Sequence, residues 1–205
     1  NCTIESSSIY SDEKVGGLIG TAMTNSIIEE CEIDKFSYVS GKNNVGGLIG
    51  YINNNTTIEN ASSSAIVKGT EYVGGIAGVS FYGTILNNLN TEGKIEGKNY
   101  VGGFIGYSQA EINTSTNNAS IIGEKYIGGL VGLNHATGNI TTSTNKGNIT
   151  VVGENAGGIV GINSGTVSSC YNVGEIDSTQ TEKLTIGGIC GQNLSDSIIN
   201  TCYNI

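Results

Sequence analysis

The chain lacks proline and tryptophan altogether and contains a single histidine among its 205 residues. Proline removes a backbone N–H donor, so its absence suits strands whose amides all serve in ladder hydrogen bonds. A zinc-protease motif needs two histidines one helical turn apart, which a single histidine excludes. A Ser–His–Asp triad would depend on His135 alone, and no pattern brings an aspartate to it. We therefore expect His135 to be a solvated residue in a turn.

Positive charge is also scarce. Lysine and arginine total 9 against 18 aspartate and glutamate residues, which gives a net charge of −9. Nucleic acids and anionic membrane surfaces are bound largely through lysine and arginine, so this balance disfavours both as partners. No apolar run approaches the ~20 residues of a membrane-spanning helix, and no signal peptide or anchor is visible. Because the chain opens and closes within a repeat, we expect residues 1–205 to be one repeat domain, a fragment of a longer chain.

Glycine, in contrast, is abundant and periodic. Seven copies of a six-residue segment, here called the GG segment, contain an apolar residue, two glycines, two apolar residues and a glycine. They occupy residues 15–20, 45–50, 73–78, 101–106, 127–132, 156–161 and 186–191. Their starts differ by 30, 28, 28, 26, 29 and 30 residues. A period near 28 indicates stacked supersecondary units, none of which can bury its apolar face alone.

Two further β-prone segments lie between successive GG segments. The first has the form I-x-x-small, as at 58–61, and the second is rich in Val and Ile, as at 66–69. Gly, Asn and Ser residues separate the three segments, and no stretch has helical spacing. Three short strands per period predict an all-β parallel β-solenoid of about seven coils, with paired strands about 4.8 Å apart. A propeller blade needs about 40–45 residues, and the leucine-rich-repeat spacing is missing.

The paired glycines have three possible backbone roles: positive φ, a bulge, or the close approach of another segment. Strict strand alternation cannot point the adjacent residues Leu18 and Ile19 both inward. We expect the glycine bend to turn both into the core; the alternative is an exposed apolar row that would act as a docking surface. Replacing Gly75 by valine is expected to destabilise the central coil.

The cysteines follow the same register. Cys2, Cys31, Cys170 and Cys202 take the small position of the I-x-x-small segment, and Cys190 lies in the last GG segment. Stacking would place Cys2 next to Cys31 and Cys170 next to Cys202. Directly stacked Cβ atoms at about 4.8 Å exceed the ~3.5–4.5 Å that a disulfide prefers. We expect free buried thiols that pack as small apolar groups, with a bridge in either pair as the alternative.

The VGGLIG pattern, with its intervening I-x-N-small and Val/Ile-rich segments, closely resembles the GLUG repeat, and residues 170–176 resemble its usual inter-motif stretch. The resemblance covers the chain almost from end to end. It implies a bacterial, extracellular setting, because GLUG arrays occur in surface proteins and adhesins. They also occur in the non-catalytic N-terminal region of IgA-protease-type zinc metallopeptidases. The resemblance brings no catalytic residue to this chain.

Other chemistry finds little support in the residues. The GG segments superficially resemble phosphate-binding loops, but strands follow them and no Lys-Ser/Thr pair closes them. Glycoside hydrolysis needs two carboxylates about 5–9 Å apart, and Glu29, Glu30 and Glu59 could lie that close on adjacent coils. The chain has no tryptophan to form a sugar-binding platform. We therefore predict no catalytic residue, no cofactor and no metal site.

Tyrosines form the candidate interaction surface. Tyr38, Tyr72, Tyr100 and Tyr126 recur in or near the turn before the GG segment. Tyrosine combines an apolar body with a polar tip, which suits interfaces and sugars. The alternative is that these rings only pack over the strand ends.

Together these features predict a non-catalytic extracellular module of a bacterial surface or secreted protein, acting as a rigid spacer or adhesive surface. Its partners would be a host or cell-surface protein or glycan, or adjacent domains of the same chain. Two alternatives stay open. One is the substrate-positioning N-terminal region of an IgA-protease-like metallopeptidase, with the catalytic site elsewhere. The other is a polysaccharide-acting β-helix enzyme.

Overall fold

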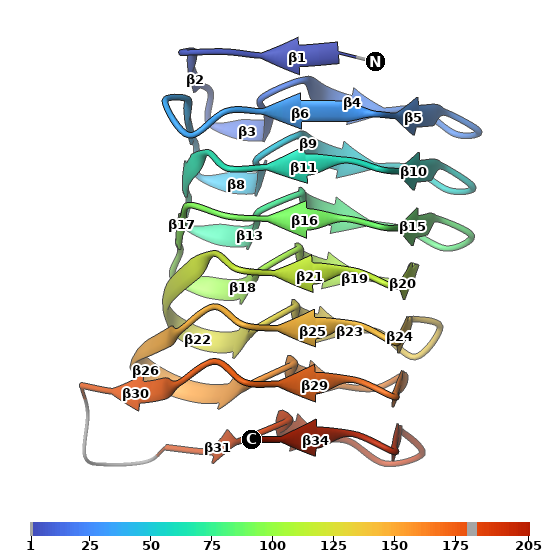
Figure 1. Ribbon diagram of the computed structural model, residues 1–205, viewed down its shortest axis with the longest axis vertical. Coiled ribbons are helices and arrows are strands. Elements are labelled where there is room, and N and C mark those ends of the chain that lie inside the picture. The colour runs from blue at the N-terminus through green and yellow to red at the C-terminus, as the bar shows by residue number, and fades with distance from the viewer. Residues whose placement is uncertain (1, 180–183) are drawn as a thin grey trace.

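The computed structural model describes residues 2–179 and 184–205, which form a stack of short β-strands with no helix among them (Figure 1). Strands one repeat apart pair in parallel throughout, so each repeat makes one coil. We number the coils 1 to 7 by the GG segment that each contains. The predicted parallel β-solenoid of about seven coils with a period near 28 is confirmed. These residues include no apolar helix of membrane-spanning length.

Two of the four sheets form the front and one side of the stack in Figure 1. The front sheet contains β1 (Cys2–Ile4), β6 (Cys31–Ile33), β11 (Ser62–Ser63), β16 (Asn90–Thr91), β21 (Thr116–Asn117), β25 (Thr144–Asn145), β29 (Tyr171–Asn172) and β34 (Tyr203–Asn204). The side sheet contains β5 (Ile27–Glu29), β10 (Thr57–Glu59), β15 (Ile85–Asn87), β20 (Glu111–Asn113), β24 (Asn139–Thr141), β28 (Thr166–Ser168) and β33 (Ile198–Asn200).

The other two sheets meet at the GG segments. The post-glycine sheet contains β4 (Ile19–Ala22), β9 (Ile49–Ile52), β14 (Ala77–Ser80), β19 (Ile105–Ser108), β23 (Val131–Asn134), β27 (Val160–Asn163) and β32 (Cys190–Asn193). The pre-glycine sheet contains β2 (Ser8–Tyr10), β3 (Glu13–Gly16), β7 (Tyr38–Ser40), β8 (Asn43–Gly46), β12 (Ile66–Lys68), β13 (Glu71–Gly74), β17 (Lys94–Glu96), β18 (Asn99–Gly102), β22 (Ser120–Gly128), β26 (Ile149–Gly157), β30 (Ile176–Ser178) and β31 (Ile186–Gly187).

A central coil has five strands where the sequence predicted three. In coil 3 these are β13 to β17. The GG segment is split by its glycines into β13 and β14. Asn88, with φ 50°, separates β15 from β16 by a left-handed corner that ends one strand and redirects the next. The predicted segments each contain a strand; the GG segment is divided in two, and the front-sheet strand β16 lies outside them.

The GG bend turns both of its large apolar residues into the core, as expected. Leu48 and Ile49 are each fully buried. The backbone N–H groups of both residues donate to the carbonyl oxygen of Ile76 in the next coil, at 3.0 and 2.9 Å. This shared acceptor interrupts the usual alternation of side chains, so neighbouring residues point the same way. In coil 1, where Leu18 and Ile19 pack at the first GG segment, both are only partly buried.

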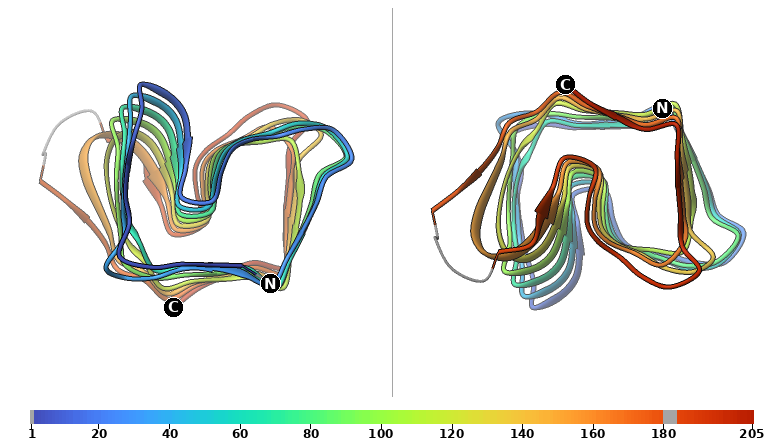
Figure 2. Two further views of the ribbon diagram at one scale, coloured as in Figure 1. Left: turned by 90° about the horizontal axis from the view of Figure 1, so that it is seen from above. Right: turned by 90° about the horizontal axis from the view of Figure 1, so that it is seen from below.

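The glycine bend also pushes the wall inward until it meets the front sheet (Figure 2). A β-carbon added to Gly103 would lie 2.5 Å from Cγ of Asn117, and one added to Gly129 would lie 2.5 Å from Cγ of Asn145. Among the described glycines, positive φ occurs at Gly83 and Gly93, outside the GG segments. Of the three proposed roles, close approach is therefore the one that requires these glycines.

Opposite the glycines, buried amides form a ladder along the front sheet. Side-chain hydrogen bonds join Thr91, Asn117, Asn145, Asn172 and Asn204 in order, at 2.6, 2.7, 2.8 and 2.7 Å. Asn145 also closes its own turn, since its Nδ2 donates to the Gly147 carbonyl and its Oδ1 accepts from the Gly147 N–H. Each buried amide thus has the partners that offset its desolvation.

The corners between strands vary in length without shifting the register of the paired strands. Between the post-glycine and side strands, coil 3 has four residues (81–84), whereas coil 4 has two (109–110). The flanking strands keep their register, with Ser80 opposite Ser108 and Leu86 opposite Ile112. The differences in repeat length are therefore absorbed in turns.

The cysteines occupy the predicted positions as free thiols; Cys31 and Cys170 are buried as expected, whereas Cys2 is exposed and Cys190 and Cys202 are only partly buried. Cys2 pairs in register with Cys31, and the pairing of Tyr171 with Tyr203 puts Cys170 next to Cys202. Burial raises the pKa of the Cys170 thiol to about 12, because the thiolate would be desolvated. Cys170 therefore stays a neutral, apolar-packing group.

Candidate functional site: an aromatic pocket in the inward fold

The inward fold at the GG segments has two walls, the pre-glycine and the post-glycine strands (Figure 2). The residue before each inward-facing valine or its equivalent lies on the first wall. The residue after the third glycine lies on the second. Aromatic side chains gather at these positions in coils 2 to 5. They line a pocket of about 210 Å³ formed by Asn44, Tyr51, Tyr72, Val79, Phe81 and Tyr107.

Three of the predicted tyrosines form a ladder on the first wall. The ring centroids of Tyr72 and Tyr100 lie 5.0 Å apart at 12°, and those of Tyr100 and Tyr126 lie 4.9 Å apart at 24°. All three rings are half-buried. The tyrosine stack in coils 3 to 5 is therefore a continuous feature, one ring per coil.

These tyrosines adopt a backbone conformation that bulky residues rarely occupy. The φ angles of Tyr72, Tyr100 and Tyr126 are 53°, 54° and 57°. Asn44 and Asn155 take the same position in coils 2 and 6 with similar φ, and asparagine tolerates the left-handed region far better. Such strain costs about 1–3 kcal/mol per residue and is concentrated at functional sites. The backbone therefore gives no reason for tyrosine at this position, and the ring itself must supply one.

The second wall brings a further set of rings. Register pairing places Tyr51, Val79 and Tyr107 on consecutive coils. Tyr107 meets Tyr72 edge-on across the fold, with centroids 6.1 Å apart at 86°. The Phe81 ring lies 5.2 Å from Tyr51 and 6.3 Å from Tyr107. Rings from both walls thus enclose the pocket on several sides.

Charge near the pocket comes from two side chains. The Lys14 ammonium lies 4.5 Å from the centroid of the Tyr51 ring, a cation–π contact. Glu71 precedes Tyr72 on β13. Burial raises the pKa of the Tyr72 hydroxyl, and the negative charge of Glu71 adds to that shift. Burial likewise raises the pKa of Tyr100. Both hydroxyls therefore stay protonated at neutral pH and can donate a hydrogen bond to a ligand.

Tyr38 does not join this group, contrary to the sequence-based grouping. It lies on β7, where it pairs with Ser8 and Ile66, and its ring is exposed. Tyr51, Phe81 and Tyr107 were not predicted from the sequence. Tyr51 and Tyr107 share the position directly after the GG segment, where other coils carry Val79 or Leu133, and Phe81 lies two residues further along its coil. Alignment of the coils by register would have placed Tyr51 and Tyr107 on one wall.

His135 also differs from its prediction. It is half-buried, and its ring lies 5.9 Å from that of Tyr107. Its Nδ1 is buried and makes no hydrogen bond to any part of the chain that the structure describes. His135 is therefore part of the aromatic wall and not a solvated turn residue.

The alternative sites have the geometry of surface ladders. Glu29 and Glu59 pair in register on adjacent side strands, as expected. Glu59 accepts a hydrogen bond from Asn87 Nδ2 at 3.0 Å, which extends a polar ladder along this sheet. Within residues 2–179 and 184–205, no three His, Cys, Asp or Glu side chains cluster as metal ligands. A strand follows each GG segment, so it lacks the helix N-terminus of a phosphate-binding loop.

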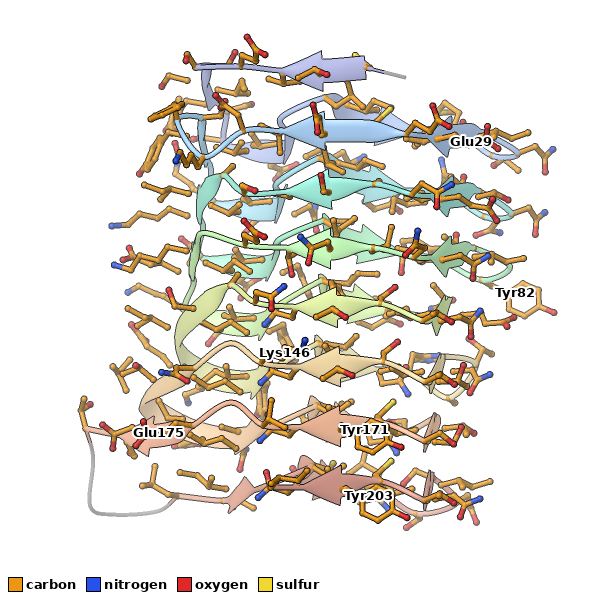
Figure 3. All side chains as sticks on the ribbon, in the orientation of Figure 1. Glu29, Tyr82, Lys146, Tyr171, Glu175 and Tyr203 are labelled. Carbon is orange, nitrogen blue, oxygen red and sulfur yellow. The ribbon has the colours of Figure 1, made fainter. Side chains whose placement is uncertain are left out.

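A second aromatic pair lies on the front sheet. Tyr171 and Tyr203 stack with centroids 5.5 Å apart at 12°, one above the other on β29 and β34 (Figure 3). Both rings are largely exposed, at 41% and 52%. Neither ring lines the aromatic pocket, so variants of this pair can serve as controls for it.

Parallel rungs, a buried amide ladder and glycine-lined bends define this chain as a repeat protein of the parallel β-solenoid class. The family model for the GLUG motif matches residues 41–68 and 123–150. The first match contains β8 to β12 and so corresponds to one complete coil. The chain therefore contains GLUG repeats at these two segments. Searches of curated proteins and of solved structures found no match to it.

Proposed function

We propose that this chain is a non-catalytic binding module, a stiff β-solenoid whose aromatic pocket and tyrosine ladder contact a partner. Following the GLUG resemblance, its setting is the surface or the secreted fraction of a bacterium, and its partner is a host or cell-surface macromolecule. Stacked rungs and the amide ladder supply the stiffness that holds the pocket in shape.

One observation carries the proposal. Tyrosine occupies a left-handed backbone position in three consecutive coils, although asparagine takes the same position in coils 2 and 6. Half-buried aromatic side chains with a polar tip are the residues most enriched in binding hot spots. A row of strained tyrosines beside a pocket is what a binding surface would require, whereas strand-end packing alone would not.

The test compares partner binding by the intact chain with binding by a variant that lacks two rings of the tyrosine ladder. Purified protein is applied to immobilised host extracellular proteins and glycans, and binding is followed by interferometry. The double variant Tyr72→Asn/Tyr100→Asn introduces the residue that the fold already accepts at this position. We expect at least a tenfold loss of affinity for the partner found. Tyr171→Asn, on the front sheet, should bind like the wild type.

Two results would overturn the proposal. Unchanged affinity in the double variant would mean that the tyrosine ladder does not contact the partner. Release of reducing sugars from glycans by the purified chain would contradict the non-catalytic role.

A further inference from the structure

The pocket is too small for a large ligand and too apolar for a hydrated ion. Its volume of about 210 Å³ is below the range of about 300–1,000 Å³ typical of drug-sized ligands. Four of its six lining residues are aromatic, one is valine and one is asparagine. One side chain of a partner matches this volume.

Open ring faces distinguish this pocket from the rest of the tyrosine ladder. Tyr100 stacks between Tyr72 and Tyr126, so both of its faces are covered. On the coil-2 side, the register neighbour of Tyr72 is Asn44, and the next ring is absent there among the described residues. The face of Tyr72 that looks toward coil 2 is therefore turned to the pocket. Aromatic faces carry negative electrostatic potential.

The chain itself supplies an example of the matching ligand. Lys14 occupies the same wall position in coil 1 that Asn44 occupies in coil 2, as the pairing of Val15 with Val45 requires. Its ammonium lies 4.5 Å from the Tyr51 centroid. Lys14 is not among the pocket-lining residues, whereas Tyr51 is. One ring of this wall thus already accepts an alkylammonium group.

The overall charge of the chain favours a cation as well, while beside the pocket Lys14 and Glu71 contribute one charge of each sign. No lining residue is cationic, and Glu71 lies next to Tyr72. The whole chain has a net charge of −9, which attracts basic partners and repels acidic ones. Open ring faces, an adjacent carboxylate and an acidic surface are the features that recognise organic cations in aromatic cages.

We propose that the pocket formed by Tyr51, Tyr72, Phe81 and Tyr107 binds a lysine or arginine side chain of a basic partner protein. The stem of that side chain packs on Val79 and the ring edges, while its charged head lies against the ring faces. This inference rests on the proposed function and specifies the chemistry of its partner. Neutral apolar residues and uncharged sugars would lose the cation–π contribution.

The test uses two short peptides that differ in charge at one side chain. Acetyl-Gly-Lys-Gly-amide and its norleucine counterpart are titrated into the intact chain, and aromatic resonances are followed by NMR. We expect the lysine peptide to bind about tenfold more tightly. It should shift the ring signals of Tyr72, Phe81 and Tyr107 and leave those of Tyr171 in place. Phe81→Leu should weaken lysine-peptide binding several-fold, whereas Tyr171→Leu should not.

The outcomes separate this inference from the broader proposal. Equal binding of the norleucine peptide would mean that the pocket accepts an apolar side chain, and the cation assignment would be wrong. Absence of any shift in the ring signals would also show that the cation assignment is wrong. The proposed binding role of the tyrosine ladder would stand in that case if Tyr72→Asn/Tyr100→Asn still abolished partner binding. Lysine-specific shifts that persist in Phe81→Leu would place the cation elsewhere and also refute the assignment.

Discussion

Replacing Gly75 by alanine tests the close approach that shapes every coil. Gly75 lies between β13 and β14, and its N–H donates to the carbonyl of Gly103 in the next coil at 3.1 Å. An added β-carbon would overlap that carbonyl oxygen and lie 2.9 Å from Thr91 Cγ2 and 3.0 Å from Ile95 Cδ1. Relief requires the two coils to separate, which lengthens the hydrogen bond and disturbs the core.

The cost follows from two contributions. Overpacking a core typically costs about 1–3 kcal/mol, and weakening one backbone hydrogen bond costs about 1 kcal/mol. Alanine also lowers the conformational entropy of the unfolded chain, which stabilises the folded state by about 0.4–1 kcal/mol. We expect a net loss of about 2–3 kcal/mol in the free energy of unfolding. For a chain of this size that corresponds to a Tm lower by about 5–10 °C, and Gly75→Val should lose more.

Thermal and urea unfolding, followed by circular dichroism, measure the effect. Gly20→Ala is the matched control, because its added β-carbon would approach only the Lys14 carbonyl oxygen, at 3.0 Å. The benefit from the unfolded state is the same in both variants, so their difference isolates the steric clash. Equal Tm values for the two variants would refute the argument that the glycines are required by close approach.

Three further results are expected. Asn145→Ala leaves Asn117 and Asn172 without their ladder partner and should cost about 2–4 kcal/mol in urea unfolding, against under about 1 kcal/mol for the exposed Asn118→Ala. Tyr100→Asn relieves the left-handed strain but loses ring stacking, so its free energy of unfolding should lie within about 1 kcal/mol of the wild-type value. Tyr100→Val should be clearly less stable, and equal stabilities of the two variants would show that the backbone at this position is not strained. Because the pKa of Cys170 is about 12, its alkylation at pH 8, followed by mass spectrometry, should be far slower than that of the exposed Cys2. The unfolded thiol ionises near pH 9 while the buried one stays neutral, so this group's contribution to stability should decline between pH 9 and 12.

The sequence predicted those parts of the fold that depend on repetition. The GG segments recur with a nearly constant period, and their stacking correctly implied buried pairs such as Leu48 and Ile49. The division into five strands was missed, since it depends on left-handed residues such as Asn88 that no composition rule marks. Contact between the GG bend and the front sheet was also missed, because it joins segments that are separate in the repeat.

The candidate site was only partly predictable. Tyr72, Tyr100 and Tyr126 recur in sequence, each two residues before the first glycine of a GG segment, and were identified by that recurrence. Tyr38 lies eight residues before its glycine and on another strand. Tyr51 and Tyr107 share one register position but are separated by Val79, and Phe81 is the one phenylalanine at its position, so the periodic signal was weak. Their role emerges from the inward fold, which brings two walls together across the glycines.

The corners between strands vary in length, whereas the paired strands that keep the coils aligned do not shift. Residues 81–84 are twice as numerous as residues 109–110 at the equivalent corner, yet the rungs on either side stay in register. Foreign peptides inserted beside Tyr82, whose side chain projects from the edge of the stack (Figure 3), should therefore be tolerated. Since Phe81 begins this same corner, lengthening it would reshape the mouth of the pocket while the interior kept its packing. The ligand selectivity of such pockets can therefore change through the length of a corner alone, without a change in the core.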